Sequence, residues 1–61
     1  MYQRYEKLRN EKGVSDYAVS KATGIDATTF SKWKHGKYAP KADKVMKIAN
    51  YFGVSLDYFY S

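Results

Sequence analysis

The sequence predicts an all-α fold, a compact five-helix domain that spans residues 1–61. Two features of the pattern predict helices: apolar residues recur every three or four positions along the whole chain, and glycines and capping residues divide that repeat into short segments. The third observation is the length of 61 residues, which allows one hydrophobic core and leaves no room for a second domain.

The first helix is expected over residues 2–12, where apolar residues recur at helical spacing among charged ones and Gly13 follows as a stop. A second helix should run to about Thr23. Ser15 can cap its first turn by accepting a hydrogen bond from a backbone amide, and Asp16 adds favourable negative charge there.

A tight turn should follow the second helix. Gly24 can supply the positive φ that a sharp exit requires, Ile25 offers an apolar plug, and Asp26 is a good N-cap for the next helix. That third helix is expected from Ala27 to about Lys34, before Gly36. Helices two and three would therefore form a helix-turn-helix.

The fourth helix is expected over residues 41–52, with Pro40 at its first position, where a missing amide hydrogen has no effect. Gly53 should end it, and Ser55 can cap a last short helix. One apolar stripe on the fourth helix should face the core: Val45, Ile48, Ala49 and Phe52.

The chain is rich in aromatic residues, with seven Tyr, three Phe and one Trp, a composition that could also suggest stacking platforms for single-stranded bases. The helical phase favours the core for four of them, because each falls at an inward position: Phe30, Trp33, Phe52 and Phe59.

Eleven Lys and Arg against six Asp and Glu give a net charge of +5, which favours a polyanionic partner. Most of the excess lies in residues 32–47, which hold six lysines and one aspartate. Nucleic acid is favoured over an anionic membrane surface, because each apolar stripe belongs to a separate short helix with its own cap and stop.

The sequence lacks the residues that several functional classes require. There is no cysteine and no zinc-type spacing, so neither a metal nor a disulfide is expected, and we predict no cofactor. No catalytic constellation and no room for a small-molecule pocket are found, so an enzyme is not expected. With no apolar run of about 20 residues and no secretory h-region, we expect a cytoplasmic protein.

Two side chains near the end of the third helix keep two interpretations each. His35 could contact a phosphate or cap the helix. Tyr38 lies in a basic loop, where its phenol could donate a hydrogen bond to a phosphate or simply be exposed.

The segment from residue 5 to residue 59 resembles the lambda-repressor-like helix-turn-helix family of phage repressors, Cro-type proteins and bacterial regulators. The resemblance rests on an ordered set of residues: Leu8-Arg9, Gly13-Val14-Ser15, Val19-Ser20, Gly24-Ile25-Asp26, Phe30, Trp33, Gly36, Pro40, Ile48-Ala49 and Phe52-Gly53-Val54-Ser55-Leu56-Asp57. It implies five helices and a homodimer on palindromic operator DNA. Because such repressors commonly carry a C-terminal dimerisation domain, truncation of a longer regulator stays open.

The resemblance also implies which positions face double-stranded DNA. The start of the third helix would contact bases, through Ala27, Thr28, Ser31 and Lys32. The start of the second helix and the loop after the third would contact phosphates, and with His35 this set is Ser15, Tyr17, His35, Lys37, Tyr38 and Lys41.

The sequence departs from the family pattern at several positions. Glutamine is frequent in the family where this chain has Asp16 and Ala27. Ala27 can only touch a thymine methyl, and Asp16 would repel a phosphate, so its expected role is at the helix dipole. Serine replaces the usual alanine at Ser20, whose hydroxyl could bond back to its own helix.

Another departure concerns Arg9, whose partner in many family members is a glutamate at the position of Lys34. Arg9 then either finds another acceptor or remains solvated with Lys34 and adds to the field facing DNA, and we favour the second slightly. The whole pattern predicts a sequence-specific transcriptional regulator of repressor type. The alternative is a protein-interaction module, such as an antitoxin or anti-repressor, against which the lysines of residues 32–47 argue.

Overall fold

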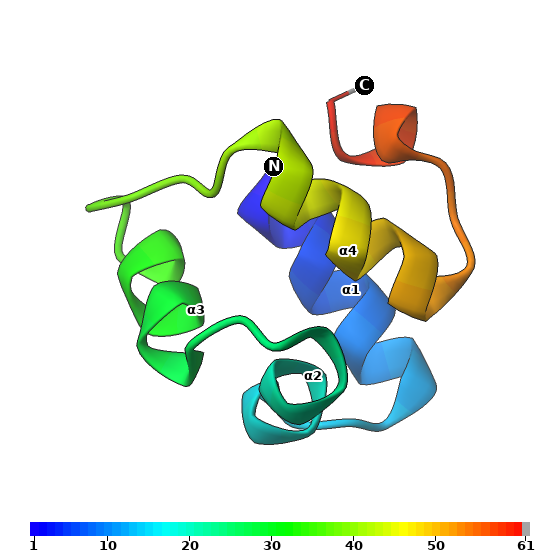
Figure 1. The fold of residues 1–61 in the computed structure, drawn as a ribbon, viewed down its shortest axis with the longest axis horizontal. Helices are drawn as coiled ribbons and strands as arrows, with labels where there is room; N and C mark the ends of the chain where they lie inside the picture. Colours follow the sequence, from blue (N-terminus) through cyan, green and yellow to red (C-terminus); the bar gives the residue numbers. More distant parts are fainter. Residues whose placement is uncertain (61) are drawn as a thin grey trace.

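The computed structural model describes residues 1–60, which form four α-helices and one short 3₁₀ helix (Figure 1). No strand occurs in this part of the chain. The elements, in order, are α1 (Tyr2–Lys12), α2 (Asp16–Thr23), α3 (Ala27–Lys34), α4 (Ala42–Phe52) and η1 (Leu56–Phe59). The all-α prediction is confirmed, with α2 and α3 joined by a short turn.

The expected fifth α-helix is instead the single turn η1. Its backbone bonds join residues three apart, Tyr58 N–H to the Ser55 carbonyl at 3.2 Å and Tyr60 N–H to the Asp57 carbonyl at 3.0 Å. The Ser55 side chain makes no capping bond. Four residues with this tighter bonding form a 3₁₀ turn, so the prediction of five α-helices was wrong by one element.

The predicted caps define the helix-turn-helix. The Ser15 hydroxyl accepts the Ala18 N–H at 3.1 Å, and the Asp26 carboxylate accepts the Thr28 N–H at 3.0 Å. Between the two helices, Gly24 has φ +77°, a left-handed conformation that favours glycine. The start of α2, the turn and the start of α3 are therefore confirmed as predicted from local sequence.

The start of α4 differs from the prediction. The helix begins at Ala42, and Lys41 is the N-cap, whose carbonyl accepts the N–H groups of Lys44 and Val45 at 3.0 Å each. Pro40 therefore lies before the helix rather than at its first position, and its side chain is buried. The predicted position was wrong because Lys41, with an extended backbone (ψ 166°), separates the proline from the first helical residue.

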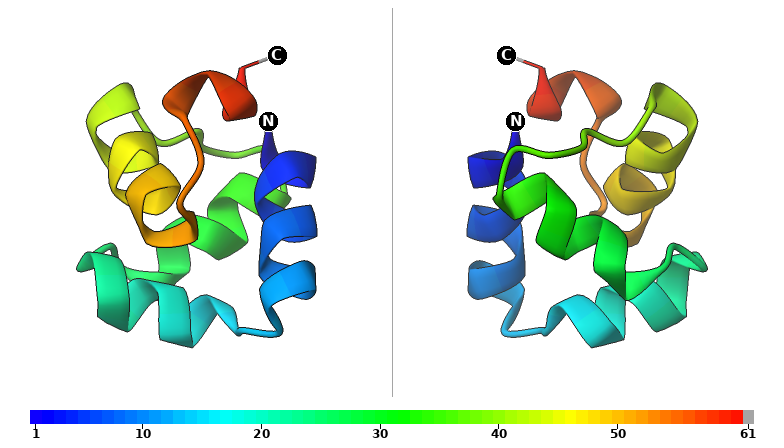
Figure 2. Two further views of the ribbon diagram at one scale, coloured as in Figure 1. Left: turned by 90° about the vertical axis from the view of Figure 1, so that its right-hand side faces the viewer. Right: turned by 90° about the vertical axis from the view of Figure 1, so that its left-hand side faces the viewer.

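The helices enclose one core within a body of 23 × 22 × 19 Å. Contacts join α2 to α3 and to α4, and η1 to α1 and α4, so the chain end covers the side of the core opposite the helix-turn-helix (Figure 2). Each helix therefore has one side against the core, and α3 presents its other side at the surface.

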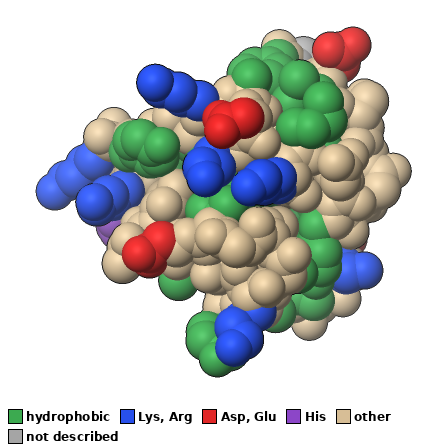
Figure 3. Space-filling model, in the orientation of Figure 1, with side chains coloured by type: hydrophobic (Ala, Val, Ile, Leu, Met, Phe, Trp, Pro, Cys, Tyr) green, Lys and Arg blue, Asp and Glu red, His purple; other side chains and the backbone are tan. Residues whose placement is uncertain are grey.

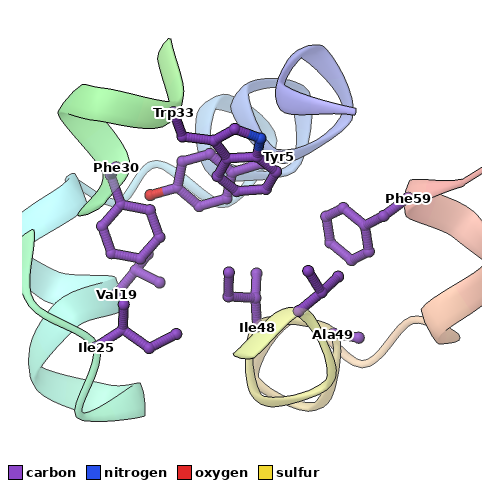
Figure 4. Close-up of a cluster of buried hydrophobic side chains, with 9 residues drawn as sticks. Tyr5, Val19, Ile25, Phe30, Trp33, Ile48, Ala49 and Phe59 are labelled. Carbon is purple, nitrogen blue, oxygen red and sulfur yellow. The ribbon is translucent and has the colours of Figure 1, made fainter. Parts of the chain in front are cut away.

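Aromatic rings from distant segments meet in the core (Figure 4). The fully buried Tyr5 ring stacks on Phe30 and on Trp33, with centroids 4.9 and 5.3 Å apart. Core placement is confirmed for Phe30, Trp33 and Phe59, whereas Phe52 is half-buried and meets Tyr5 edge-on at 6.2 Å. Within residues 1–60, the hydrophobic core cluster consists of Tyr5, Val19, Ile25, Phe30, Trp33, Val45, Ile48, Ala49 and Phe59.

Candidate nucleic-acid interface

Helix α3 is oriented by its two buried aromatic residues. Because Phe30 and Trp33 face the core, residues on the opposite side of α3 must project outward. Three of the four residues predicted to contact bases are exposed on this helix: Thr28, Ser31 and Lys32. The fourth, Ala27, is half-buried at the first position of the helix.

The first turn of α3 carries an exposed carboxylate. The same Asp26 Oδ1 atom accepts the backbone N–H and the side-chain hydroxyl of Thr28, both at 3.0 Å. These hydrogen bonds, and after them the attraction of Lys32, lower the pKa of Asp26 below its usual range. Asp26 is therefore a charged cap at neutral pH.

The start of α2 presents the two phosphate-contact candidates predicted there. The Ser15 hydroxyl uses an oxygen lone pair to accept the Ala18 amide, which leaves its hydrogen to donate. Tyr17 is 67% exposed, and the Lys21 ammonium lies 5.7 Å from the centre of its ring. Lys21 was not predicted as a site residue, although its position one helical turn after Tyr17 could have indicated the contact.

The segment after α3 carries the other phosphate-contact candidates, all of them exposed: His35, Lys37, Tyr38 and Lys41. His35 occupies the C-cap of α3, and Lys41 occupies the N-cap of α4. Lys and Arg side chains gather over the end of α3 and this loop, at the left edge of Figure 3. The positive charge predicted from residues 32–47 thus reaches the surface beside α3.

In the right-hand view of Figure 2, α3 crosses the face nearest the viewer, with α2 below and the loop that follows α3 above. The predicted base-contacting residues lie on α3, and the predicted phosphate-contacting residues lie on the elements at either end of it. The fold therefore brings the elements that carry the predicted site residues to one side of the molecule.

Asp16, at the first position of α2, joins α1 to the helix-turn-helix. Its Oδ1 atom accepts the Tyr5 hydroxyl at 2.6 Å and lies 3.3 Å from Arg9 Nε, an ion pair without a hydrogen bond. A second Arg9 nitrogen, Nη1, donates to the Val14 carbonyl at 3.4 Å. The expectation that Arg9 stays solvated with Lys34 was wrong, because Arg9 pairs with the Asp16 carboxylate and donates its hydrogen bond to the Val14 carbonyl.

This network also changes the role expected for Asp16. The residue does lie in the first turn of α2, as the dipole argument requires, but its carboxylate also binds Tyr5 and Arg9. Burial, and then the hydrogen bond to the carboxylate, raises the pKa of Tyr5 well above the usual range. With the Arg9 cation beside it, the Asp16 carboxylate repels a nearby phosphate less than an unpaired one would.

Ser20 lies on α2 where the turn to α3 packs closely. Its hydroxyl donates to the carbonyl of Ile25, across the turn, and not to its own helix. The predicted back-bond within α2 is instead made by Thr23, whose hydroxyl donates to the Val19 carbonyl at 2.8 Å. Serine at this position therefore links α2 to the turn by a hydrogen bond, which an alanine there could not form.

Residues 1–60 contain no group of three or more potential metal-ligating side chains. No helix in this range is long and apolar enough to cross a membrane. The outward side of α3 carries exposed polar and basic side chains.

Two short helices joined by a tight turn, the second with an outward side free for a partner, are the arrangement that defines helix-turn-helix proteins. Residues 6–59 match the family described as helix-turn-helix, and the chain belongs to this family, which is of the lambda-repressor and Cro type. The chain is also similar to the SPbeta prophage-derived uncharacterized HTH-type transcriptional regulator YonR of Bacillus subtilis (strain 168).

The two sequences are 32% identical over 56 residues, which cover 92% of this chain. The chain spans about half the length of that relative, 52%. No solved structure matches the chain.

Proposed function

We propose that the chain is a sequence-specific regulator of transcription that binds double-stranded DNA in the cytoplasm and acts as a repressor. The observation that carries this proposal is the orientation of α3. Its aromatic residues are buried while Thr28, Ser31 and Lys32 are exposed, with further lysines in the segment that follows. This arrangement suits a helix that enters the major groove.

In this proposal α3 distinguishes bases and its neighbours hold the backbone. Lys32 reaches guanine O6 and N7, and Thr28 lies one turn earlier against the adjoining pair. The hydroxyl of Ser15 and the side chains of Lys37 and Lys41 bind phosphates, which fix the position of α3 without selecting a sequence.

The binding unit proposed on DNA is a homodimer on a palindromic operator. Half-sites of such operators repeat about every 34–36 Å, one turn of the duplex. Each domain is at most 23 Å long, so two copies fit on neighbouring half-sites without overlap. Selection of bound duplexes from a random pool tests this, because two-fold symmetric binding enriches palindromic sequences.

Salt titration tests the nucleic-acid partner itself. If each domain neutralises about four to six phosphates, log affinity falls against log salt with a slope of about −4 to −5, at roughly 0.9 per phosphate. A slope near zero would contradict DNA binding and favour a protein partner for the same surface.

A matched pair of variants separates base contacts from phosphate contacts. Lys32→Ala and Lys41→Ala each remove one exposed ammonium, the first from α3 and the second from the N-cap of α4. We expect Lys32→Ala to weaken the selected operator by about tenfold and random duplex less, since a good base contact discriminates by about 1–3 kcal/mol. Lys41→Ala should weaken both alike and reduce the salt slope by about one.

Circular dichroism must show both variants folded before the comparison is made. Equal losses on operator and random duplex for Lys32→Ala would assign that lysine to a phosphate instead of a base.

A further inference from the structure

The Thr28 hydroxyl group has already used its hydrogen. It donates to the Asp26 carboxylate at 3.0 Å, on the exposed side of α3. A threonine hydroxyl has one hydrogen to donate and two lone pairs to accept with. Thr28 can therefore offer a partner outside the protein only an acceptor oxygen and a methyl group.

The hydrogen should remain with Asp26 when DNA binds. Donation to an ionised carboxylate is roughly twice as strong as donation to a neutral acceptor, and exclusion of water strengthens it. The Thr28 amide holds the same oxygen at 3.0 Å, so the carboxylate cannot turn away without losing the cap. The lowered pKa of Asp26 keeps that carboxylate ionised at neutral pH.

We propose that Asp26 restricts the Thr28 hydroxyl to accepting hydrogen bonds from DNA, and we call this restriction the polarity of Thr28. As a result, Thr28 selects an A·T base pair and rejects guanine. The inference rests on the proposed function, namely that α3 lies in the major groove. Adenine presents the N6 amino group as a donor for the Thr28 oxygen, and thymine presents a methyl group for the Thr28 methyl. Guanine presents only acceptors, N7 and O6, which would face an oxygen that has no hydrogen to donate.

A cytosine amino group could also donate to the Thr28 oxygen, but a G·C pair has no methyl group to match the second feature. The A·T pair alone fits both groups that Thr28 has left. The chemistry that this residue recognises is therefore one amino donor together with one methyl.

Selection from a random pool locates the contact. The wild type and Thr28→Ala are compared, and the Thr28 position in the operator is the one whose preference is lost in the variant. We expect adenine or thymine there. Thr29→Ala, the matched control at a half-buried neighbour, should leave every preference unchanged.

Base analogues then separate the two contacts. Replacing thymine by uracil at that position removes the methyl and should weaken the wild type about fourfold, the value for one buried methyl. Replacing adenine by purine removes the amino group and should weaken the wild type at least threefold. Thr28→Val keeps a methyl and loses the oxygen, so it should respond to uracil and not to purine.

Asp26→Gly tests the cause of the polarity. Glycine is tolerated as an N-cap, and the variant releases the Thr28 hydrogen. We expect the ratio of adenine to guanine affinity at that position to fall at least threefold while circular dichroism shows the helices retained.

The outcomes distinguish this inference from the proposed function. No enriched sequence at all, with salt-independent binding, would overturn the proposed function. An enriched operator with guanine at the Thr28 position, or no position that responds to Thr28→Ala, would overturn the inference alone. An unchanged ratio in Asp26→Gly would overturn the role of Asp26.

Discussion

Replacing Tyr5 by phenylalanine removes a single hydroxyl from the core and keeps the ring that stacks on Phe30 and Trp33. The variant loses the hydrogen bond from Tyr5 to Asp16. A hydrogen bond to a charged partner contributes about 1.5–3 kcal/mol. The Asp16 side chain is 40% exposed, so water can replace the lost donor, and we expect a loss of about 1.5 kcal/mol at pH 7.

The loss should depend on pH, because folding raises the pKa of Tyr5. Above pH about 10, the ordinary tyrosine value, the unfolded chain releases the Tyr5 proton while the folded protein retains it. The stabilisation is thus fully present below pH 10 and decreases as the pH rises, by about 1.4 kcal/mol per pH unit. Tyr5→Phe has no such proton, so its stability should equal that of the parent near pH 11.

The assay is urea unfolding followed by circular dichroism between pH 7 and about pH 11, on the parent and on Tyr5→Phe. All other titrating groups are common to both proteins, so the difference between them reports Tyr5. Tyr60→Phe, at a residue that is 55% exposed, is the matched control and should follow the parent throughout. A difference that stays constant over the whole pH range would refute the reasoning.

Three further substitutions test the packing and the caps. Trp33→Ala removes a ring that is 4% exposed, which should lower the free energy of unfolding by about 3–5 kcal/mol, out of a total of about 3–9 kcal/mol for a chain of this length. Thermal melting followed by circular dichroism should therefore show loss of helix near room temperature. A folded variant that fails to bind DNA would instead place Trp33 at the interface. Gly24→Ala meets no atom within 4 Å but needs φ +77°, so urea unfolding should show a loss of about 1–2 kcal/mol, and no loss would contradict the turn geometry. Ser15→Ala should lose about 1 kcal/mol in the same assay, and an unchanged midpoint would mean that the cap does not stabilise α2.

The features predicted well from the sequence are those that neighbouring residues determine. Ser15 and Asp26 cap helices through bonds to amides two or three residues ahead, and Gly24 ends α2 by its own conformation. The helical repeat likewise placed Phe30 and Trp33 inside. Because each of these depends on spacing within one or two turns, a single sequence was enough to predict them.

The features missed depend on contacts across the fold. Tyr5 and Asp16 are eleven residues apart, and no periodic pattern connects them. Pro40 satisfies the rule for a first helical position, yet it lies before the helix, with the extended Lys41 between them, and its side chain is buried. One feature of the sequence could have indicated the ion pair between Arg9 and Asp16. Lys34 stands where many family members have the glutamate that pairs with this arginine, and an arginine without its usual partner suggests another carboxylate nearby.

The position of the Arg9 partner has a consequence for protein engineering. The ion pair joins α1 to α2. Arg9 therefore does not depend on an acidic residue in α3. The outward residues Ser31 and Lys32 can then be exchanged as a set, while Phe30 and Trp33 keep the helix seated. The domain is therefore a suitable scaffold for libraries in which the recognition surface is randomised and new operators are assigned to it.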